Sequence, residues 1–115
     1  MFQQRQINDI YQLVEVSFAT VAPGAITTGS KASVTVSPVI GGGAGLSASQ
    51  CVLGDQVLQV IAPAGAGNLG GLIISGQVSA AGQVTVSFFN ASTGTITPTS
   101  AVYTFVIARF TPTLL

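Results

Sequence analysis

Charged side chains are scarce in this sequence. Its 115 residues include three basic and three acidic ones, 5% of the chain, whereas an ordinary soluble domain carries about 25%. Histidine and tryptophan are absent, and there is one cysteine. Catalysis by side chains needs titratable groups held close together, so this composition gives no direct indication of chemistry. It indicates a neutral surface of small polar residues. A free monomer usually depends on surface charge to stay soluble, so such a surface is better suited to contact with other protein.

These absences exclude several kinds of active site. Without histidine there is no Ser–His triad and no Cys–His pair, and with one cysteine and no histidine a zinc site is excluded. The carboxylates are far apart in the sequence and share no local motif; a calcium site built from Asp55 and backbone carbonyls is the alternative left open. A Ser–Lys dyad would need Lys31, which lies at a strand start where a solvated lysine is expected. We therefore expect no enzyme and no cofactor.

The remaining polar features have ordinary interpretations. Residues 41–45 are rich in glycine, but neither the Lys-Ser/Thr end of a P-loop nor a helix follows them, so a flexible surface loop is expected. Asp55 and Arg109 could pair across a sheet, or each could mark a strand end that faces water. Cys51 is expected to be a buried, inert thiol, with an interchain bridge as the alternative.

Net charge and hydropathy bear on the partners. The formal net charge is zero, so there is no basic footprint for nucleic acid. The mean hydropathy of +0.67 raises the question of a membrane, but no stretch of about 20 apolar residues runs without polar or glycine interruptions. The first ten residues lack the apolar segment of a secretory signal. We expect neither nucleic acid nor a membrane as a partner.

Apolar residues recur with a period of two, which predicts strands. In the run 83–89, for example, Val84, Val86 and Phe88 share one face. The run 56–62 is more uniformly apolar and is expected to be buried on both faces. The predicted strands are 13–19, with Val14, Val16 and Phe18 on one face, and 32–37, 56–62, 72–78, 83–89 and 101–109.

Turn residues separate these runs. Ala81-Gly82 is the best candidate for a hairpin turn, because Gly82 can adopt a positive φ angle. Six to seven short strands separated by turns predict one all-β domain over residues 12–115. Its expected architecture is a single antiparallel β-sandwich of jelly-roll or immunoglobulin-like type, with a small barrel as the alternative.

Two segments stand apart from the strands. Residues 1–11 contain Arg5 and Asp9, and form an N-terminal arm, a short helix or a frayed terminus. The loop 39–46 is the other. We expect these two segments to contact other subunits, through Phe2, Arg5, Ile7, Ile10, Tyr11, Ile40 and Leu46.

The second half of the chain carries a resemblance to a known group of proteins. It contains LGDQVLQVIAP at 53–63, GLIISGQVSAAGQVTVSFFN at 71–90, TGTITP at 93–98 and YTFVIAR at 103–109. This order resembles a domain common in virion proteins of tailed bacteriophages, over about half of the chain. The resemblance implies a β-sandwich that works by packing into a capsid or a tail. The first half shows no such resemblance and would hold the particular docking contacts.

This resemblance, together with the low charge, favours a structural protein located in the virion. Within that class we expect a capsid cement, or decoration, protein on the capsid surface. It would form a homo-oligomer, a dimer or trimer, and bridge adjacent subunits of the major capsid protein or other virion proteins. The alternatives are a tail fibre, tail tip or neck component, and a receptor- or glycan-binding module that uses the loop tips.

Overall fold

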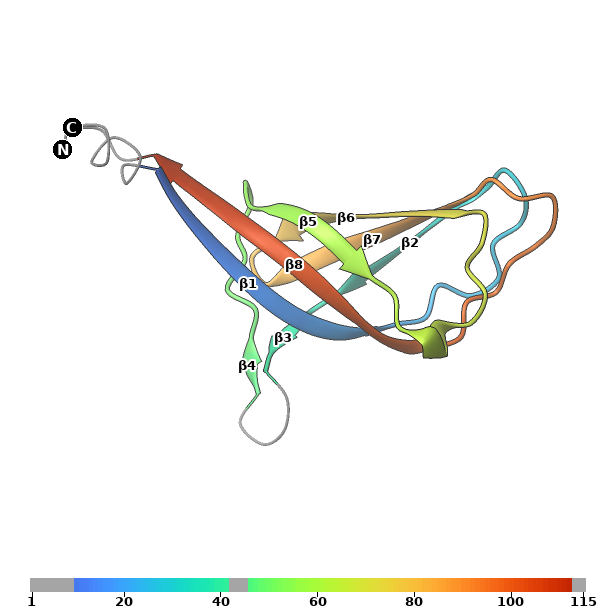
Figure 1. The fold of residues 1–115 in the computed structure, drawn as a ribbon, viewed down its shortest axis with the longest axis horizontal. Coiled ribbons are helices and arrows are strands. Elements are labelled where there is room, and N and C mark those ends of the chain that lie inside the picture. Colours follow the sequence, from blue (N-terminus) through green and yellow to red (C-terminus); the bar gives the residue numbers. More distant parts are fainter. Residues whose placement is uncertain (1–9, 42–45, 113–115) are drawn as a thin grey trace.

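The computed structural model describes residues 10–41 and 46–112, and the side chains of residues 14–41 and 46–110. These ranges contain eight strands, one 3-10 turn and no α-helix (Figure 1). Each of the six longer strands overlaps one of the six predicted strands, and two further strands of two residues each were not predicted. In chain order the elements are β1 (Ile10–Val21), β2 (Lys31–Val36), β3 (Val39–Ile40), β4 (Ser47–Ala48), β5 (Gln56–Ile61), η1 (Ala64–Ala66), β6 (Leu72–Ala80), β7 (Gln83–Asn90) and β8 (Ala101–Pro112).

The strands form two antiparallel sheets that pack as a sandwich, which confirms the predicted fold class. One sheet has the order β4-β3-β1-β8-β5, and the other has the order β2-β7-β6. In an immunoglobulin sandwich the second, fifth and fourth strands are neighbours in one sheet, and the third pairs with the sixth in the other. Apart from the short β3 and β4, the neighbours β2-β7-β6 and β5-β8 repeat this pattern in chain order. The topology is therefore immunoglobulin-like, and β1 lies beside β8 where the last strand of such a domain would lie.

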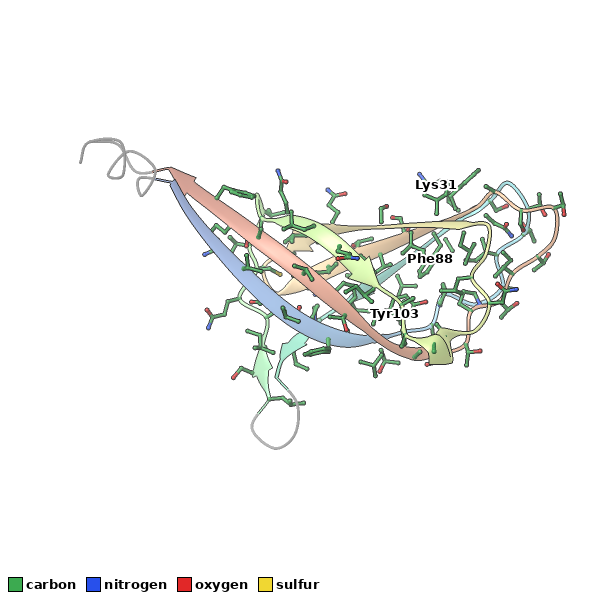
Figure 2. The ribbon with its side chains drawn as sticks, in the orientation of Figure 1. Lys31, Phe88 and Tyr103 are labelled. Atoms are coloured by element: carbon green, nitrogen blue, oxygen red, sulfur yellow. The ribbon has the colours of Figure 1, made fainter. Side chains whose placement is uncertain are left out.

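The core between the sheets comes mainly from β7 and β8. Val84, Val86 and Phe88 of β7 are fully buried, and so are Tyr103 and Phe105 of β8. The rings of Phe88 and Tyr103 meet edge to face, with centroids 6.2 Å apart (Figure 2). The predicted alternation of these two strands is thus confirmed.

The alternating pattern of β1 does not indicate which of its two faces is buried. Val14, Val16 and Phe18 share one face as predicted, but that face is the outside of the five-stranded sheet, where Val14 and Val16 are exposed. Ser17, on the inner face, is fully buried. Glu15, also on the inner face, finds hydrogen-bond donors in the segment that precedes β5, whereas the hydroxyl of Ser17 has no hydrogen-bond partner among the described residues.

The expectation that residues 56–62 are buried on both faces is wrong. A register shift between Val57 and Gln59 inserts an extra residue against β8, so that Val57 and Val60 both pair with inward-facing positions. Leu58 and Ile61 are exposed. β5 is an edge strand, and no described residue covers the outside of its sheet, so only one of its faces packs against the core.

The chain turns between β6 and β7 as predicted. Ala80 pairs with Gln83, and Gly82 has a φ of 70°. A positive φ at this place is readily adopted by glycine and costs other residues conformational energy.

β1 and β8 pair from Ile10 opposite Pro112 to Val21 opposite Ala101. The end of this ribbon at Ile10 and Pro112 extends past the other strands (Figure 1). Ile10 and Tyr11, which the sequence assigned to an arm or a short helix, are therefore strand residues. The helical alternative is wrong for these two, while residues 1–9 lie outside the described ranges.

Candidate functional site

Three of the chain's charged residues meet at one end of the sandwich. Glu15 lies in β1, Arg109 lies in β8, and Asp55 is the residue that directly precedes β5. Arg109 donates hydrogen bonds from Nε to Oδ1 of Asp55 and from Nη2 to Oδ2, both at 2.8 Å. The pairing of Asp55 with Arg109 that the sequence offered as one of two possibilities is confirmed. The bidentate geometry makes this a strong, directional contact.

The environment of the pair favours its charged form. The Asp55 side chain is 5% exposed and that of Arg109 is 37% exposed. The hydrogen bonds from Arg109 hold the pKa of Asp55 below its ordinary value of 3.8; burial opposes this shift, and the N–H of Val52, 2.9 Å from Oδ2, adds to it. Asp55 in turn raises the pKa of Arg109. Both groups are therefore ionised throughout the neutral range.

Glu15 is held by the same segment of chain. Its carboxylate accepts a hydrogen bond from the hydroxyl of Ser49 and another, at 2.9 Å, from the N–H of Gln50. Arg109 Nη2 also donates to the carbonyl of Gln50, at 3.1 Å. We call these five residues, Glu15, Ser49, Gln50, Asp55 and Arg109, the carboxylate clasp, because they fasten the segment 49–55 to the β1–β8 pair.

The clasp borders a hollow of about 340 Å³ that Cys51 and Ile40 also line. Each of the four carboxylate oxygens of Glu15 and Asp55 already accepts a hydrogen bond from the protein. A carboxylate oxygen has two lone pairs, and in this cluster only Oδ2 of Asp55 accepts two hydrogen bonds. In the described ranges, no three His, Cys, Asp or Glu side chains gather as a metal site. The contacts themselves fasten the segment 49–55 to β1 and β8.

Cys51 lies within the clasped segment, and its thiol is buried, as the sequence predicted. Its carbonyl accepts a hydrogen bond from the N–H of Gly82, at 2.8 Å. The segment is thereby tied to the β6–β7 turn as well as to the β1–β8 pair.

The outside of the five-stranded sheet carries many exposed apolar side chains, and its polar positions among the described side chains are the uncharged Thr20, Thr104, Gln56 and Gln59. Exposed fractions reach 54% at Val14 and 53% at Val102, values that are unusual for several apolar side chains on one face of a sheet. No charged residue lies among them. We define the apolar face as the outward side chains Val14, Val16, Phe18, Ile61, Val102, Val106 and Phe110.

One end of this face is hollowed. A groove of about 780 Å³ lies where Phe18 and Val102 meet Val39 and Leu46, and its lining is mainly apolar. Leu46 is half exposed at the rim. We refer to this hollow as the apolar groove.

The outside of the three-stranded sheet has a different composition. Ser33, Ser87 and Ser75 stand in one row across β2, β7 and β6. In the next row Thr35 and Thr85 share a hydrogen bond of 2.9 Å between their hydroxyls. We call this surface the hydroxyl face. Lys31, exposed at the start of β2 as predicted, is its charged residue (Figure 2).

The residues predicted for subunit contact lie in different parts of the molecule. Ile40 lines the hollow beside the clasp and Leu46 lines the apolar groove. Ile10 and Tyr11 belong to β1 and pair with Pro112 and Thr111 of β8. Phe2, Arg5 and Ile7 lie outside the described residues.

Three comparisons with known proteins found no match. No protein-family model matches the chain, no curated protein matches it, and no solved structure matches it. Among the described residues there is also no helix long and apolar enough to cross a membrane.

Proposed function

We propose that this chain is a structural protein of a phage virion, and within that class a capsid cement protein that joins neighbouring capsid subunits. The observation that carries the proposal is a nearly uncharged surface. Arg5 and Asp9 lie outside the described residues, and of the other charged residues Glu15, Asp55 and Arg109 are engaged in the carboxylate clasp. A surface of hydroxyls and apolar groups can be covered by protein without the large cost of desolvating ions.

The sequence motifs support the same function. The segments at 53–63, 71–90 and 103–109 resemble a domain of tailed-phage virion proteins, and they form β5, the β6–β7 hairpin and β8. These strands make the immunoglobulin-like core, so the resemblance falls on the part of the chain that forms the sandwich.

The mechanism would be adhesive. The β1–β8 ribbon extends from the body, and β1 begins at Ile10. We assign the contact with a neighbouring subunit to Phe2, Arg5 and Ile7, which precede β1 in the sequence. Contacts between small neutral surfaces add up because they are repeated around a symmetric shell.

We infer that the chain is not an enzyme. The only gathering of titratable groups in the described residues is the carboxylate clasp, and each of its carboxylate oxygens already accepts a hydrogen bond from the protein. Removing any of these donors would disturb the fold before it freed a catalytic group.

Binding to purified shells tests the function. Shells of the encoding phage that lack this protein are incubated with the full chain, with a variant lacking residues 1–9, and with Lys31→Gln as a control. We expect the full chain and the control to sediment with the shells and the truncated variant to bind less. Because β1 begins at Ile10, the truncation leaves the strand pairing intact.

The number of copies in intact particles separates the alternatives. A cement protein occurs in on the order of hundreds of copies, following the symmetry of the shell, whereas a tail fibre, tip or neck component occurs in about a dozen or fewer. Absence from particles, or binding to host cells instead of shells, would overturn the proposal and favour a receptor- or glycan-binding module.

A further inference from the structure

The apolar face carries a projection and a groove at equal distances from its centre. Phe110, which is 49% exposed, stands near one end, and the apolar groove beside Val102 lies near the other. The pair Val16–Val106 lies midway. Four residues separate Val106 from Phe110 and four separate it from Val102, so each distance is about 14 Å at roughly 3.4 Å per residue.

We propose that a second copy of this chain covers the apolar face, related by a two-fold axis that crosses β1 and β8 at the Val16–Val106 pair. This rotation lays β8 of one copy along β8 of the other in the opposite direction. Phe110 of each copy then meets the apolar groove of its partner, and every contact occurs twice, as an isologous dimer requires. Two sheet faces packed in this way interdigitate their side chains.

The lack of charge favours a second copy over a different protein. In a two-fold contact the residues near the axis meet their own counterparts, so a charged face would repel itself. Among the described side chains, none of the outward positions of β1, β8 and β5 is charged; those that are polar are Thr20, Thr104, Gln56 and Gln59. A different partner is usually selected by complementary charges, and this face offers none.

The size of the face is sufficient for a dimer of modest stability. β1 and β8 have 12 residues each and β5 has 6. Strands of these lengths, about 3.4 Å per residue and 4.8 Å apart, give a flat area on the order of 500 Å². Two copies would then bury on the order of 1,000 Å², near the lower bound for a specific interface.

The hydroxyl face is the more polar of the two, although Ile73, which is 61% exposed, and Phe89 lie on it in the same row as Lys31. Its Ser and Thr side chains bond to one another, as Thr35 does to Thr85, and can bond to water. The two outer faces of the sandwich therefore allow a matched experiment. A glutamate introduced on the apolar face should prevent dimer formation, whereas a glutamate introduced on the hydroxyl face should leave the dimer intact.

The mass of the isolated protein in solution is the first test, measured by sedimentation equilibrium without any shell present. We expect a dimer for the parent chain, a monomer for Val16→Glu, and a dimer for the matched control Ser75→Glu on the hydroxyl face. Thermal melts followed by circular dichroism verify that each variant is folded. A monomeric parent chain, or dissociation by Ser75→Glu instead of Val16→Glu, would overturn the proposal. Shell binding is measured separately, so the cement function and the dimer can fail independently.

Cross-linking tests the arrangement within the dimer. With a short bis-maleimide, Val106→Cys should cross-link to itself, because the axis places it opposite its own counterpart. Val102→Cys and Phe110→Cys should each fail to cross-link alone and should link to each other when the two variants are mixed. The parent chain, whose Cys51 is buried, is the control. Self-linking by Val102→Cys, or no linking by Val106→Cys in a dimer, would show that the copies pack in another way.

Discussion

Gly76 of β6 lies so close to Val60 of β5 that a Cβ atom on the glycine would stand 2.8 Å from Cγ2 of the valine. The same atom would stand 2.9 Å from Cγ1 of Val57. The bulge in β5 turns both valines inward, and the two sheets approach each other here only because β6 presents no side chain.

Replacement of this glycine by alanine should therefore destabilise the fold. Overpacking of a tight core typically costs about 1–3 kcal/mol, and we expect a loss of this size for Gly76→Ala in urea denaturation. Gly65→Ala is the matched control, because its Cβ would meet no atom within 4 Å; it should change stability by less than about 0.5 kcal/mol. Equal stabilities for the two variants would mean that the sheets can separate at Gly76 without cost.

The Asp55–Arg109 pair should make stability depend on acid. The pKa of Asp55 is below 3.8 in the folded chain and near 3.8 in the unfolded chain, so the unfolded state binds the proton first as the pH falls. The stabilisation is complete above about pH 5 and is lost as the pH drops through the folded pKa. Asp55→Asn should be less stable than the parent at pH 7, and the difference should shrink below pH 3.8. Lys31→Gln, which removes an exposed charge, should keep the acid dependence of the parent.

Asn90 should be among the most sensitive polar residues. It is fully buried, and its Nδ2 donates to the carbonyls of Ile26 and Gly94, both at 2.8 Å. Its Oδ1 accepts from the N–H and the hydroxyl of Ser92. Asn90→Ala removes all four of these hydrogen bonds and leaves the N–H of Ser92 without a partner, whereas the carbonyls of Ile26 and Gly94 keep their bonds from Ile96 N–H and the Ser92 hydroxyl. A loss of about 2–4 kcal/mol is expected.

A matched asparagine provides the control for that measurement. Asn68 is exposed and accepts one hydrogen bond, from the N–H of Gly70. Asn68→Ala should cost less than about 1 kcal/mol. A similar loss in both variants would indicate that the loop after Asn90 reorganises and bonds to water instead.

The strands could be predicted because their signals are local. Alternation in 83–89 and a glycine at position 82 specify a hairpin without reference to the rest of the chain. The sidedness of β1 could not be predicted in this way. Glu15 is held on the inner face by donors from Ser49 and Gln50, and those residues come more than thirty positions later in the sequence. Ser17 is buried on the same face although its hydroxyl has no hydrogen-bond partner among the described residues.

In the candidate site, too, some contacts could be predicted from the sequence and others could not. Opposite charges at two strand ends, Asp55 and Arg109, suggested a pair from sequence alone, and the pair exists. The participation of Glu15 had no signal, because its partners are a serine hydroxyl and a backbone N–H, which are too common to mark a motif. The apolar face was equally hidden, since a period of two identifies two faces of a strand but not which of them is covered.

Tyr103 carries a hydroxyl that contributes nothing to the fold through hydrogen bonds. The side chain is fully buried, its oxygen has no hydrogen-bond partner in the described structure, and desolvation raises the pKa of the phenol. Burying an unpaired hydroxyl costs about 1–3 kcal/mol, so Tyr103→Phe, which keeps the ring against Phe88, should leave stability unchanged or raise it by about 1 kcal/mol. Tyr103→Leu, which removes the edge-to-face contact as well, should lower it. A loss of more than about 1 kcal/mol in Tyr103→Phe would show that a buried water satisfies the hydroxyl.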